Sequence, residues 1–146
     1  MTRSSAVVID AGVGILQVIA DPLSDQVDAR WNEWVREAVS VCAPRLWLNE
    51  ATSVLYKIFK QNLVSEDRDR EAFDALLDLN VELYEADTEA CRQAFDWATR
   101  LNQFQAYDGF YMALAEQLDA PFWTTDRRLV NRARQIGVNW VFWVGE

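Results

Sequence analysis

The chain has 146 residues with a formal net charge of −9 at pH 7, and 51% of its residues are hydrophobic. A chain this rich in apolar side chains is not intrinsically disordered, and its length favours one domain over residues 1–146. No apolar stretch reaches the roughly 18 residues that a membrane span needs, and no signal-peptide pattern opens the sequence. We therefore expect a soluble, cytoplasmic protein.

The sequence contains no histidine. That absence excludes a Ser-His-Asp triad, a histidine general base and a histidine-ligated zinc site. Cys42 and Cys91 form no CxxC motif and are predicted to be buried free thiols. Any catalysis must therefore depend on carboxylates, hydroxyls, arginines or the two lysines, Lys57 and Lys60.

Short apolar runs rich in β-branched and aromatic residues alternate along the chain with segments of helical apolar spacing. Strands are predicted at residues 6–9, 40–43, 81–84, 121–123 and 139–144. Helices are predicted at about residues 13–19, 25–39, 45–61, 65–78, 87–101, 108–118 and 127–136. Pro44 is assigned to the first turn of one helix, and Ser65 to the start of another. The alternation predicts an α/β domain with a mainly parallel sheet.

Four acids lie at the boundaries of these elements and not on solvated helix faces. Asp10 ends the first strand, and Glu50 lies near the start of the helix after the second. Asp108 opens an apolar helix, and Asp126 follows the next strand. In a parallel sheet such positions crowd together beside the point where the strand order reverses, so we expect the four carboxylates to converge. Taken singly, each also suits an ordinary capping or first-turn position of a helix.

Converging carboxylates repel and raise each other's pKa, and a bound cation resolves that repulsion. Oxygen ligands suit Mg²⁺ or Mn²⁺, which can acidify a bound water and stabilise charge on a phosphodiester. The acidic chain argues against binding nucleic acid through bulk charge, but a divalent cation reverses the local sign. Arg127 and Arg128, with Arg132 and Arg134, also form a local basic patch, although these residues equally suit the solvated face of the last helix.

Four segments together carry a more specific pattern. They are Val8-Ile9-Asp10-Ala11, Pro44 with Leu48-Asn49-Glu50-Ala51, Tyr107-Asp108-Gly109-Phe110-Tyr111-Met112-Ala113-Leu114-Ala115-Glu116, and Ala120-Pro121-Phe122-Trp123-Thr124-Thr125-Asp126-Arg127-Arg128-Leu129. The pattern resembles the PIN-domain ribonucleases, and most closely the VapC-type toxins of toxin–antitoxin pairs, over the whole chain. The chain departs from that family at Gly12, where members often have Ser, Thr or Asn two residues after the first acid.

The resemblance implies a three-layer α/β/α sandwich with a parallel central sheet and a metal-dependent endoribonuclease activity. It assigns the Mg²⁺ or Mn²⁺ ligands to four acids, Asp10, Glu50, Asp108 and Asp126. Asp10 and Asp108 are expected to bind the ion directly. Thr124 takes the position of a hydroxyl beside the last acid, and Arg127 and Arg128 are expected to guide the RNA backbone. The resemblance also implies a homodimer and a cognate antitoxin protein.

Other acidic α/β sites fit the sequence less well. A response-regulator receiver domain needs a lysine at a late strand end, and both lysines of this chain lie on one predicted helix. A phosphatase of the haloacid dehalogenase type needs a second aspartate at the position of Gly12. The serious alternative is a PIN-like domain that binds a protein partner and no longer cleaves RNA.

Overall fold

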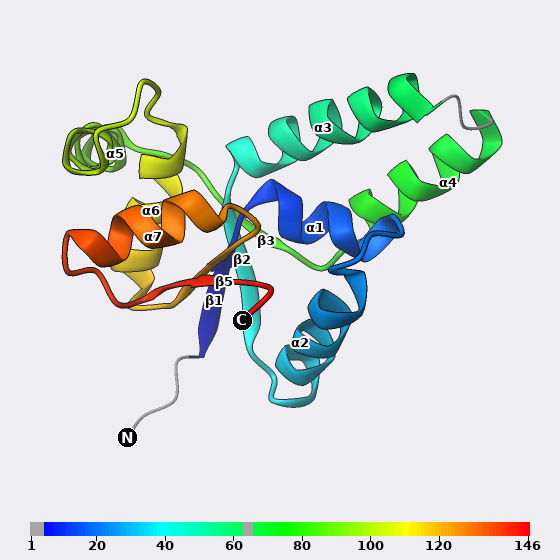
Figure 1. Cartoon of the computed structure of the whole chain (residues 1–146), viewed down its shortest axis with the longest axis horizontal. Helices are drawn as coiled ribbons and strands as arrows, with labels where there is room; N and C mark the ends of the chain where they lie inside the picture. The colour runs from blue at the N-terminus through cyan, green and yellow to red at the C-terminus, as the bar shows by residue number, and fades with distance from the viewer. Residues whose placement is uncertain (1–4, 63–65) are drawn as a thin grey trace.

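A parallel sheet of five short strands forms the centre of the computed structural model, which describes residues 5–62 and 66–146 (Figure 1). The strands are β1 (Ala6–Ile9), β2 (Ser40–Pro44), β3 (Glu82–Tyr84), β4 (Phe122–Thr124) and β5 (Val141–Trp143). Their order is β3-β2-β1-β4-β5, and each pairing between neighbours is parallel. The predicted α/β class and parallel sheet are therefore confirmed.

Seven helices connect the strands in the described part of the chain. They are α1 (Ala11–Val18), α2 (Ser24–Arg36), α3 (Leu46–Asn62), α4 (Glu66–Leu77), α5 (Thr88–Leu101), α6 (Tyr107–Leu118) and α7 (Arg127–Gln135). The connections from β1 through β2 to β3 carry α1 to α4 on one face of the sheet (Figure 1), as the right-handed rule for parallel crossovers predicts. The return crossover to β4 and β5 runs in the opposite direction and places α5 to α7 on the other face, as Figure 1 shows.

Two neighbouring residues of β4 show how the two helical layers are held. Phe122 is fully buried and its ring stacks on Tyr111 of α6, with 5.5 Å between ring centroids. Trp123 points to the opposite face, where its ring meets that of Trp34 on α2 at 6.2 Å. Because alternate residues of a strand face opposite sides of the sheet, this short strand anchors both layers.

The strand order reverses between β1 and β4, and this point decides where the acids meet. The register aligns Ile9 of β1 with Trp123 of β4. The next pair along the two strands is therefore Asp10 and Thr124, at the carboxyl edge of the sheet. Crevices outside the carboxyl ends of parallel strands, at such a switch point, are the usual ligand sites of this class of fold.

Three local predictions need correction or lie outside the structure. Pro44 ends strand β2, where it pairs with Tyr84, and the helix begins two residues later at Leu46. Cys42 is buried as predicted, but Cys91 is exposed because it lies on the side of α5 that faces an open cavity. The predicted helix start at Ser65 lies outside the described residues. None of the helices in the described ranges is long and apolar enough to cross a lipid bilayer.

Gly109 lies where α5 and α6 make their closest approach. A Cβ atom added to Gly109 would overlap the backbone carbonyl of Ala94 on α5. A backbone carbonyl cannot turn aside as a flexible side chain can. Glycine is therefore the residue that lets the two helices pack at this distance, directly beside Asp108.

We expect Gly109→Ala to lower the free energy of unfolding by about 1–3 kcal/mol through overpacking. The sign of this change in the free energy of unfolding is informative, because a Gly to Ala change in an exposed helix usually stabilises the protein by about 1 kcal/mol. Urea unfolding followed by circular dichroism measures the change. Gln117→Ala, at an exposed position of the same helix, is the control and should stay within about 0.5 kcal/mol of wild type. An unchanged Gly109→Ala midpoint would contradict the close approach of α5 and α6.

Candidate active site at the carboxyl edge of the sheet

Asp10 is held by three hydrogen bonds at the switch point. Its Oδ1 accepts the backbone N–H of Val13 at 3.0 Å, which caps helix α1. Its Oδ2 accepts the hydroxyl of Thr124 at 2.5 Å and the backbone N–H of Thr125 at 3.2 Å. The carboxylate thus joins the end of β1 to the end of β4, and it combines the predicted cap with a place in the acidic site.

Thr124 connects Asp10 to the second acid of this edge. It is completely buried, and its Oγ1 accepts the backbone N–H of Asp126 at 2.9 Å while donating to Asp10. Asp126 is exposed and caps helix α7, since its Oδ1 accepts the N–H groups of Arg128 and Leu129. Thr124 lies beside Asp126, as predicted. Its buried hydroxyl bonds both Asp10 and the backbone of Asp126, and so positions the two acids.

Asp108 lies in the first turn of α6 and is oriented by a residue that the sequence analysis did not single out. The side-chain amide of Gln103 donates to Asp108 Oδ2 at 2.8 Å, although the expected helix-capping bond by Asp108 is not formed. The Gln103 Oε1 atom is buried without a hydrogen-bond partner in the described part of the protein. A glutamine directly after a helix that ends in a left-handed residue, Asn102, was the only local signal.

Glu50 is the fifth residue of α3, and a hydrogen-bond donor that the sequence did not predict orients its carboxylate. The phenol of Tyr111 donates to Glu50 Oε1 at 2.8 Å. Tyr111 is buried, and its ring stacks on Phe122 of β4. In the sequence, Tyr111 is part of the apolar stripe of a helix. That pattern predicts the burial of Tyr111, but it does not predict the hydrogen bond from its hydroxyl to Glu50.

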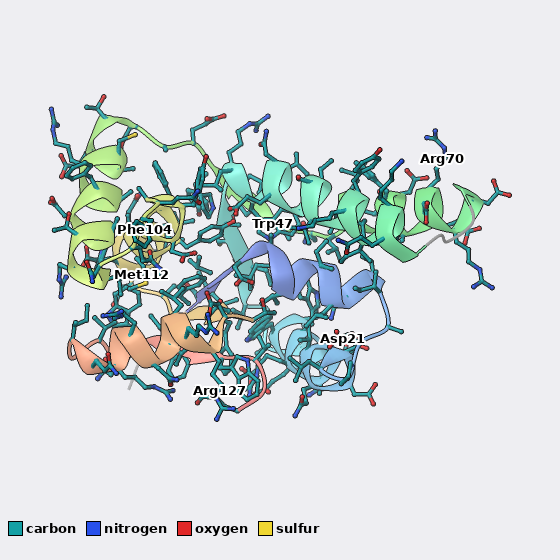
Figure 2. All side chains as sticks on the ribbon, turned by 45° about the horizontal axis from the view of Figure 1, so that its top comes forward. Asp21, Trp47, Arg70, Phe104, Met112 and Arg127 are labelled. Carbon is teal, nitrogen blue, oxygen red and sulfur yellow. The ribbon has the colours of Figure 1, made fainter. Side chains whose placement is uncertain are left out.

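Trp47 fixes the backbone beneath this edge, in the middle of the molecule (Figure 2). Its indole N–H donates to the backbone carbonyl of Asp10 at 2.9 Å, and its ring takes the space beside Gly14 on α1. A neighbouring side chain also occupies the space beside Gly12, where a Cβ would overlap the hydroxyl of Thr125. The Thr125 side chain therefore fills the space next to Asp10 that a serine or threonine at position 12 would take.

The electrostatics show that negative charge gathers at this edge. Burial, assisted by the nearby charge of Asp108, raises the pKa of Asp10 from 3.8 to about 6. Burial also raises the pKa of Glu50, and Asp108 raises it further. The pKa of Asp108 is raised by burial and by Asp126. The pKa of the Tyr111 phenol is raised by burial and by Glu50, so this hydroxyl remains a proton donor. The charge of Asp108 thus disfavours the ionisation of Asp10 and Glu50, and the charge of Asp126 disfavours that of Asp108.

The four acids do not form a ready-made ligand set in the described residues, where no three acidic or cysteine side chains are grouped as a cation would hold them. Each carboxylate is engaged by a protein donor. A second oxygen on Glu50, Asp108 and Asp126 accepts no hydrogen bond from the described residues. The oxygen atoms of these four carboxylates are the kind of ligand that Mg²⁺ and Mn²⁺ prefer.

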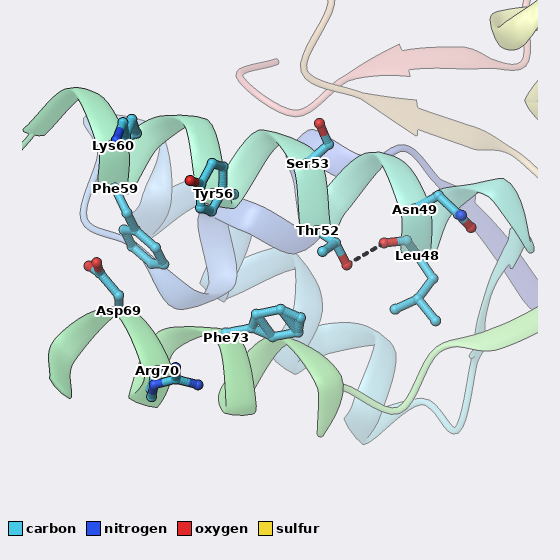
Figure 3. A pocket seen from close by; sticks show the side chains of 10 residues that line it. All are labelled: Leu48, Asn49, Thr52, Ser53, Tyr56, Phe59, Lys60, Asp69, Arg70 and Phe73. Atoms are coloured by element: carbon cyan, nitrogen blue, oxygen red, sulfur yellow. Dashed lines mark hydrogen bonds between the residues drawn. The ribbon is translucent and has the colours of Figure 1, made fainter. Parts of the chain in front are cut away.

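Two cavities lie near α3, and they differ in their relation to the acids. A groove of about 860 Å³ between α3 and α4 is lined by Tyr56, Phe59 and Phe73 among others, and includes none of the four acids (Figure 3). A second cavity of about 810 Å³ opens between α3 and the α5–α6 layer and includes Glu50. The second cavity is therefore the one that one of the four acids, Glu50, lines.

The basic residues of the predicted RNA contact lie at the start of α7. Arg127 and Arg128 are both exposed, directly after Asp126. The Arg127 guanidinium lies over the ring of Trp143, 4.8 Å from its centroid, at the end of β5. This stacking fixes one positive charge beside the acidic edge.

The family of the chain follows from a comparison with family models. Residues 8–139 match the model of the PIN domain, so the chain belongs to the PIN domain family. That match includes all four acids, and it confirms the resemblance that the sequence motifs indicated. A comparison with curated proteins gives no match.

Solved structures agree with this fold. PAE2754 from Pyrobaculum aerophilum is 17% identical with a TM-score of 0.67, covering 97% of this chain and 85% of that one. VapC20 from Mycobacterium tuberculosis, a sarcin-ricin loop cleaving toxin, is 12% identical with a TM-score of 0.61 and coverages of 86% and 93%. FitAB bound to the IR36 DNA fragment is 14% identical with a TM-score of 0.69 and coverages of 96% and 96%. At these identities the similarity establishes the fold alone.

The raised pKa of Asp10 predicts a specific dependence of stability on pH. A carboxyl whose pKa rises from 3.8 to about 6 on folding adds stability that is fully present below pH 3.8 and lost as pH rises through 6. Between pH 7.5 and 5, acidification should therefore add about 1–2 kcal/mol to the free energy of unfolding through this group. The raised pKa values of Glu50 and Asp108 act in the same direction.

Urea unfolding at pH 7.5, 6 and 5 in a chelating buffer measures this dependence. Asp10→Asn should flatten the profile, because the variant has no proton to take up at this position. Glu116→Gln, on the exposed side of α6, should keep the slope of the wild type. Equal slopes for Asp10→Asn and wild type would show that Asp10 does not titrate in this range.

Proposed function

We propose that this chain is a Mg²⁺- or Mn²⁺-dependent endoribonuclease and the toxin of a type II toxin–antitoxin pair. The main support is the position of Asp10, Glu50, Asp108 and Asp126 around the carboxyl edge of a PIN fold, where the charge of Asp108 raises the pKa of Asp10 and of Glu50. Such a concentration of negative charge favours a hard divalent cation over water alone.

The four acids take different parts in this proposal. Asp10 and Asp108 are the proposed direct ligands, because the charge of Asp108 raises the pKa of Asp10, which indicates that the two carboxylates lie near each other. Glu50 and Asp126 complete the ligand set with their free oxygens, and Thr124 holds Asp10 and Asp126 at a fixed separation. A bound divalent cation at such a site lowers the pKa of water and stabilises charge on a phosphodiester.

RNA is the proposed substrate. The net charge of −9 repels a phosphate backbone, so local features must provide the attraction. A cation bound by the acids would make the local charge positive, and Arg127 and Arg128 add two positive charges beside it. The name of VapC20 as a sarcin-ricin loop cleaving toxin supports RNA over DNA as the substrate class of this similar fold.

The proposed protein partners are an antitoxin and a second copy of the chain. The similarity to VapC20 and FitAB supports a place in a toxin–antitoxin pair. The acidic edge suits a basic segment of the antitoxin, since opposite charges give specificity and fast association. Co-purification with the product of the neighbouring gene tests this partner. We place the complex in the cytoplasm, where the RNA substrate is available.

Calorimetric titration of Mn²⁺ is the decisive first test, because it needs no knowledge of the RNA target. We expect one or more Mn²⁺ ions to bind the wild type, and Asp10→Asn and Asp108→Asn each to lower the affinity at least tenfold. Cleavage of the RNA substrate in Mn²⁺ should be lost in Asp108→Asn. Glu116→Gln is the control for a general loss of charge. Circular dichroism checks that each variant is folded.

Mn²⁺ affinity should also fall as the solution is acidified from pH 7.5 to 5.5. Cation binding requires the ionised carboxylate, and the pKa of Asp10 is about 6 without an ion. Binding below pH 6 should therefore release protons, which titrations in buffers of different ionisation enthalpy detect. An affinity that does not change with pH would indicate an ion bound elsewhere.

One observation favours the alternative of a PIN-like binding module without nuclease activity. Both oxygens of Asp10 already accept hydrogen bonds from the protein, and no preformed ligand group exists among the described residues. A wild type that binds no Mn²⁺ but co-purifies with a partner would support this alternative. Loss of Mn²⁺ binding in Asp108→Asn with retained partner binding would support the nuclease.

A further inference from the structure

The cavity beside Glu50 has walls from three separate parts of the chain. Arg45, Asn49 and Ser53 come from the junction of β2 and α3 and from α3 itself, Glu85 and Cys91 from the loop after β3 and the start of α5, and Tyr107 and Phe110 from α6. Asn49 directly precedes Glu50, and Tyr107 directly precedes Asp108. Of the four acids, Glu50 is the one that lines the cavity.

The lining groups have the chemistry that nucleobases require. Tyr107 is 55% exposed, so a large part of its aromatic side chain is open to solvent. Asn49 is also exposed, and its amide provides both donors and an acceptor for the polar edge of a base. The volume of about 810 Å³ is in the range of small-molecule sites. Aromatic faces that stack bases, with amides that bind their edges, are typical of single-stranded RNA recognition.

Arg45 adds a positive charge at the same cavity. Its Nε lies 3.1 Å from Glu85 Oε1, and both side chains are mostly exposed. An exposed ion pair of this kind contributes little free energy, so the guanidinium can exchange its partner at small cost. A phosphate oxygen is a favourable replacement because arginine binds phosphate through two parallel hydrogen bonds.

We infer that this cavity binds one unpaired nucleobase of the RNA strand whose phosphodiester lies at the acids. This inference rests on the proposed nuclease function and adds a binding site to it. Tyr107 stacks on the base, Asn49 contacts its edge, and Arg45 contacts the adjoining phosphate. Stacking needs no net positive charge, so it provides affinity that a chain of charge −9 cannot obtain from its bulk electrostatics. A base paired within a duplex cannot enter the cavity.

Fluorescence anisotropy with the full chain tests the inference. The probe is a fluorescein-labelled, unstructured RNA of about 12 nucleotides, compared with the same strand in a duplex, because single-strand sites typically span about 4–16 nucleotides. Ca²⁺ replaces Mn²⁺, since it accepts oxygen ligands with a less strict geometry, and gel electrophoresis checks that the RNA stays intact. The wild type should bind the single strand at least tenfold more tightly than the duplex.

The Tyr107 variants give the sharpest comparison. Tyr107→Ala should weaken single-strand binding by about 5- to 100-fold, the loss of one base stack. Tyr107→Phe should bind like the wild type, because it keeps the ring. The matched control is Tyr56→Ala, which removes an exposed tyrosine of α3 that lines the other groove, and it should leave RNA binding unchanged. Thermal unfolding confirms that the three variants are folded.

Several results would overturn the inference. They are wild-type binding to neither RNA form, equal binding of duplex and single strand, unchanged binding in Tyr107→Ala, and an equal loss in Tyr56→Ala. A Tyr107→Ala variant that changes from dimer to monomer in sedimentation, with unchanged RNA binding, would show that a second copy covers the cavity. Failure of the nuclease proposal is distinct, because it appears as absent Mn²⁺ binding or cleavage while the Tyr107 effect on RNA binding remains.

Discussion

The hydrogen bond from Thr124 to Asp10 fixes the pairing register of β1 and β4, and the site depends on that register. Thr124 is the fully buried polar side chain of β4, and its hydroxyl reaches Asp10 at 2.5 Å and the N–H of Asp126 at 2.9 Å. A shift of β4 by one residue would place Trp123 or Thr125 opposite Asp10 and turn every side chain of the strand to the other face. Phe122 would then lose its stack on Tyr111, and Tyr111 would no longer be held beneath Glu50.

The acids of this edge serve the fold and the proposed chemistry at once. Asp10 and Asp126 cap α1 and α7, so each carboxylate satisfies backbone N–H groups that would otherwise lack partners. Glu50 and Asp108 are held by Tyr111 and Gln103. At Asp10, the hydrogen bonds from Thr124, Val13 and Thr125 stabilise the ionised carboxylate, whereas burial destabilises it. Burial has the larger effect, so the pKa of Asp10 is raised to about 6. A divalent cation would shift that balance toward the charged form, which links ion binding to stability.

The charge of the chain limits how it can bind a polyanion. With −9 overall and acids at the centre of the proposed site, attraction must come from a bound cation, from arginines at the rim and from contacts that do not depend on charge. The cavity beside Glu50 offers the last kind through Tyr107 and Phe110. In the proposed toxin–antitoxin pair, a basic antitoxin segment would compete for the same edge, so inhibition and catalysis would depend on one electrostatic feature.

The sequence by itself determined the elements and the positions of the acids, because helical and strand periodicities and capping residues act over a few neighbours. The segment from Ala106 to Leu129 predicted a buried helix, a short strand and an acid at each boundary, and the structure has them there. Only the tertiary structure decided the partners of those acids. The bonds of Gln103 to Asp108 and of Tyr111 to Glu50 could not be predicted from local pattern. The exposure of Cys91 depends on a cavity between α3 and the α5–α6 layer, and Pro44 belongs to a strand because β3 pairs beside it. Each of these depends on contacts between residues far apart in the chain, which local periodicity does not encode.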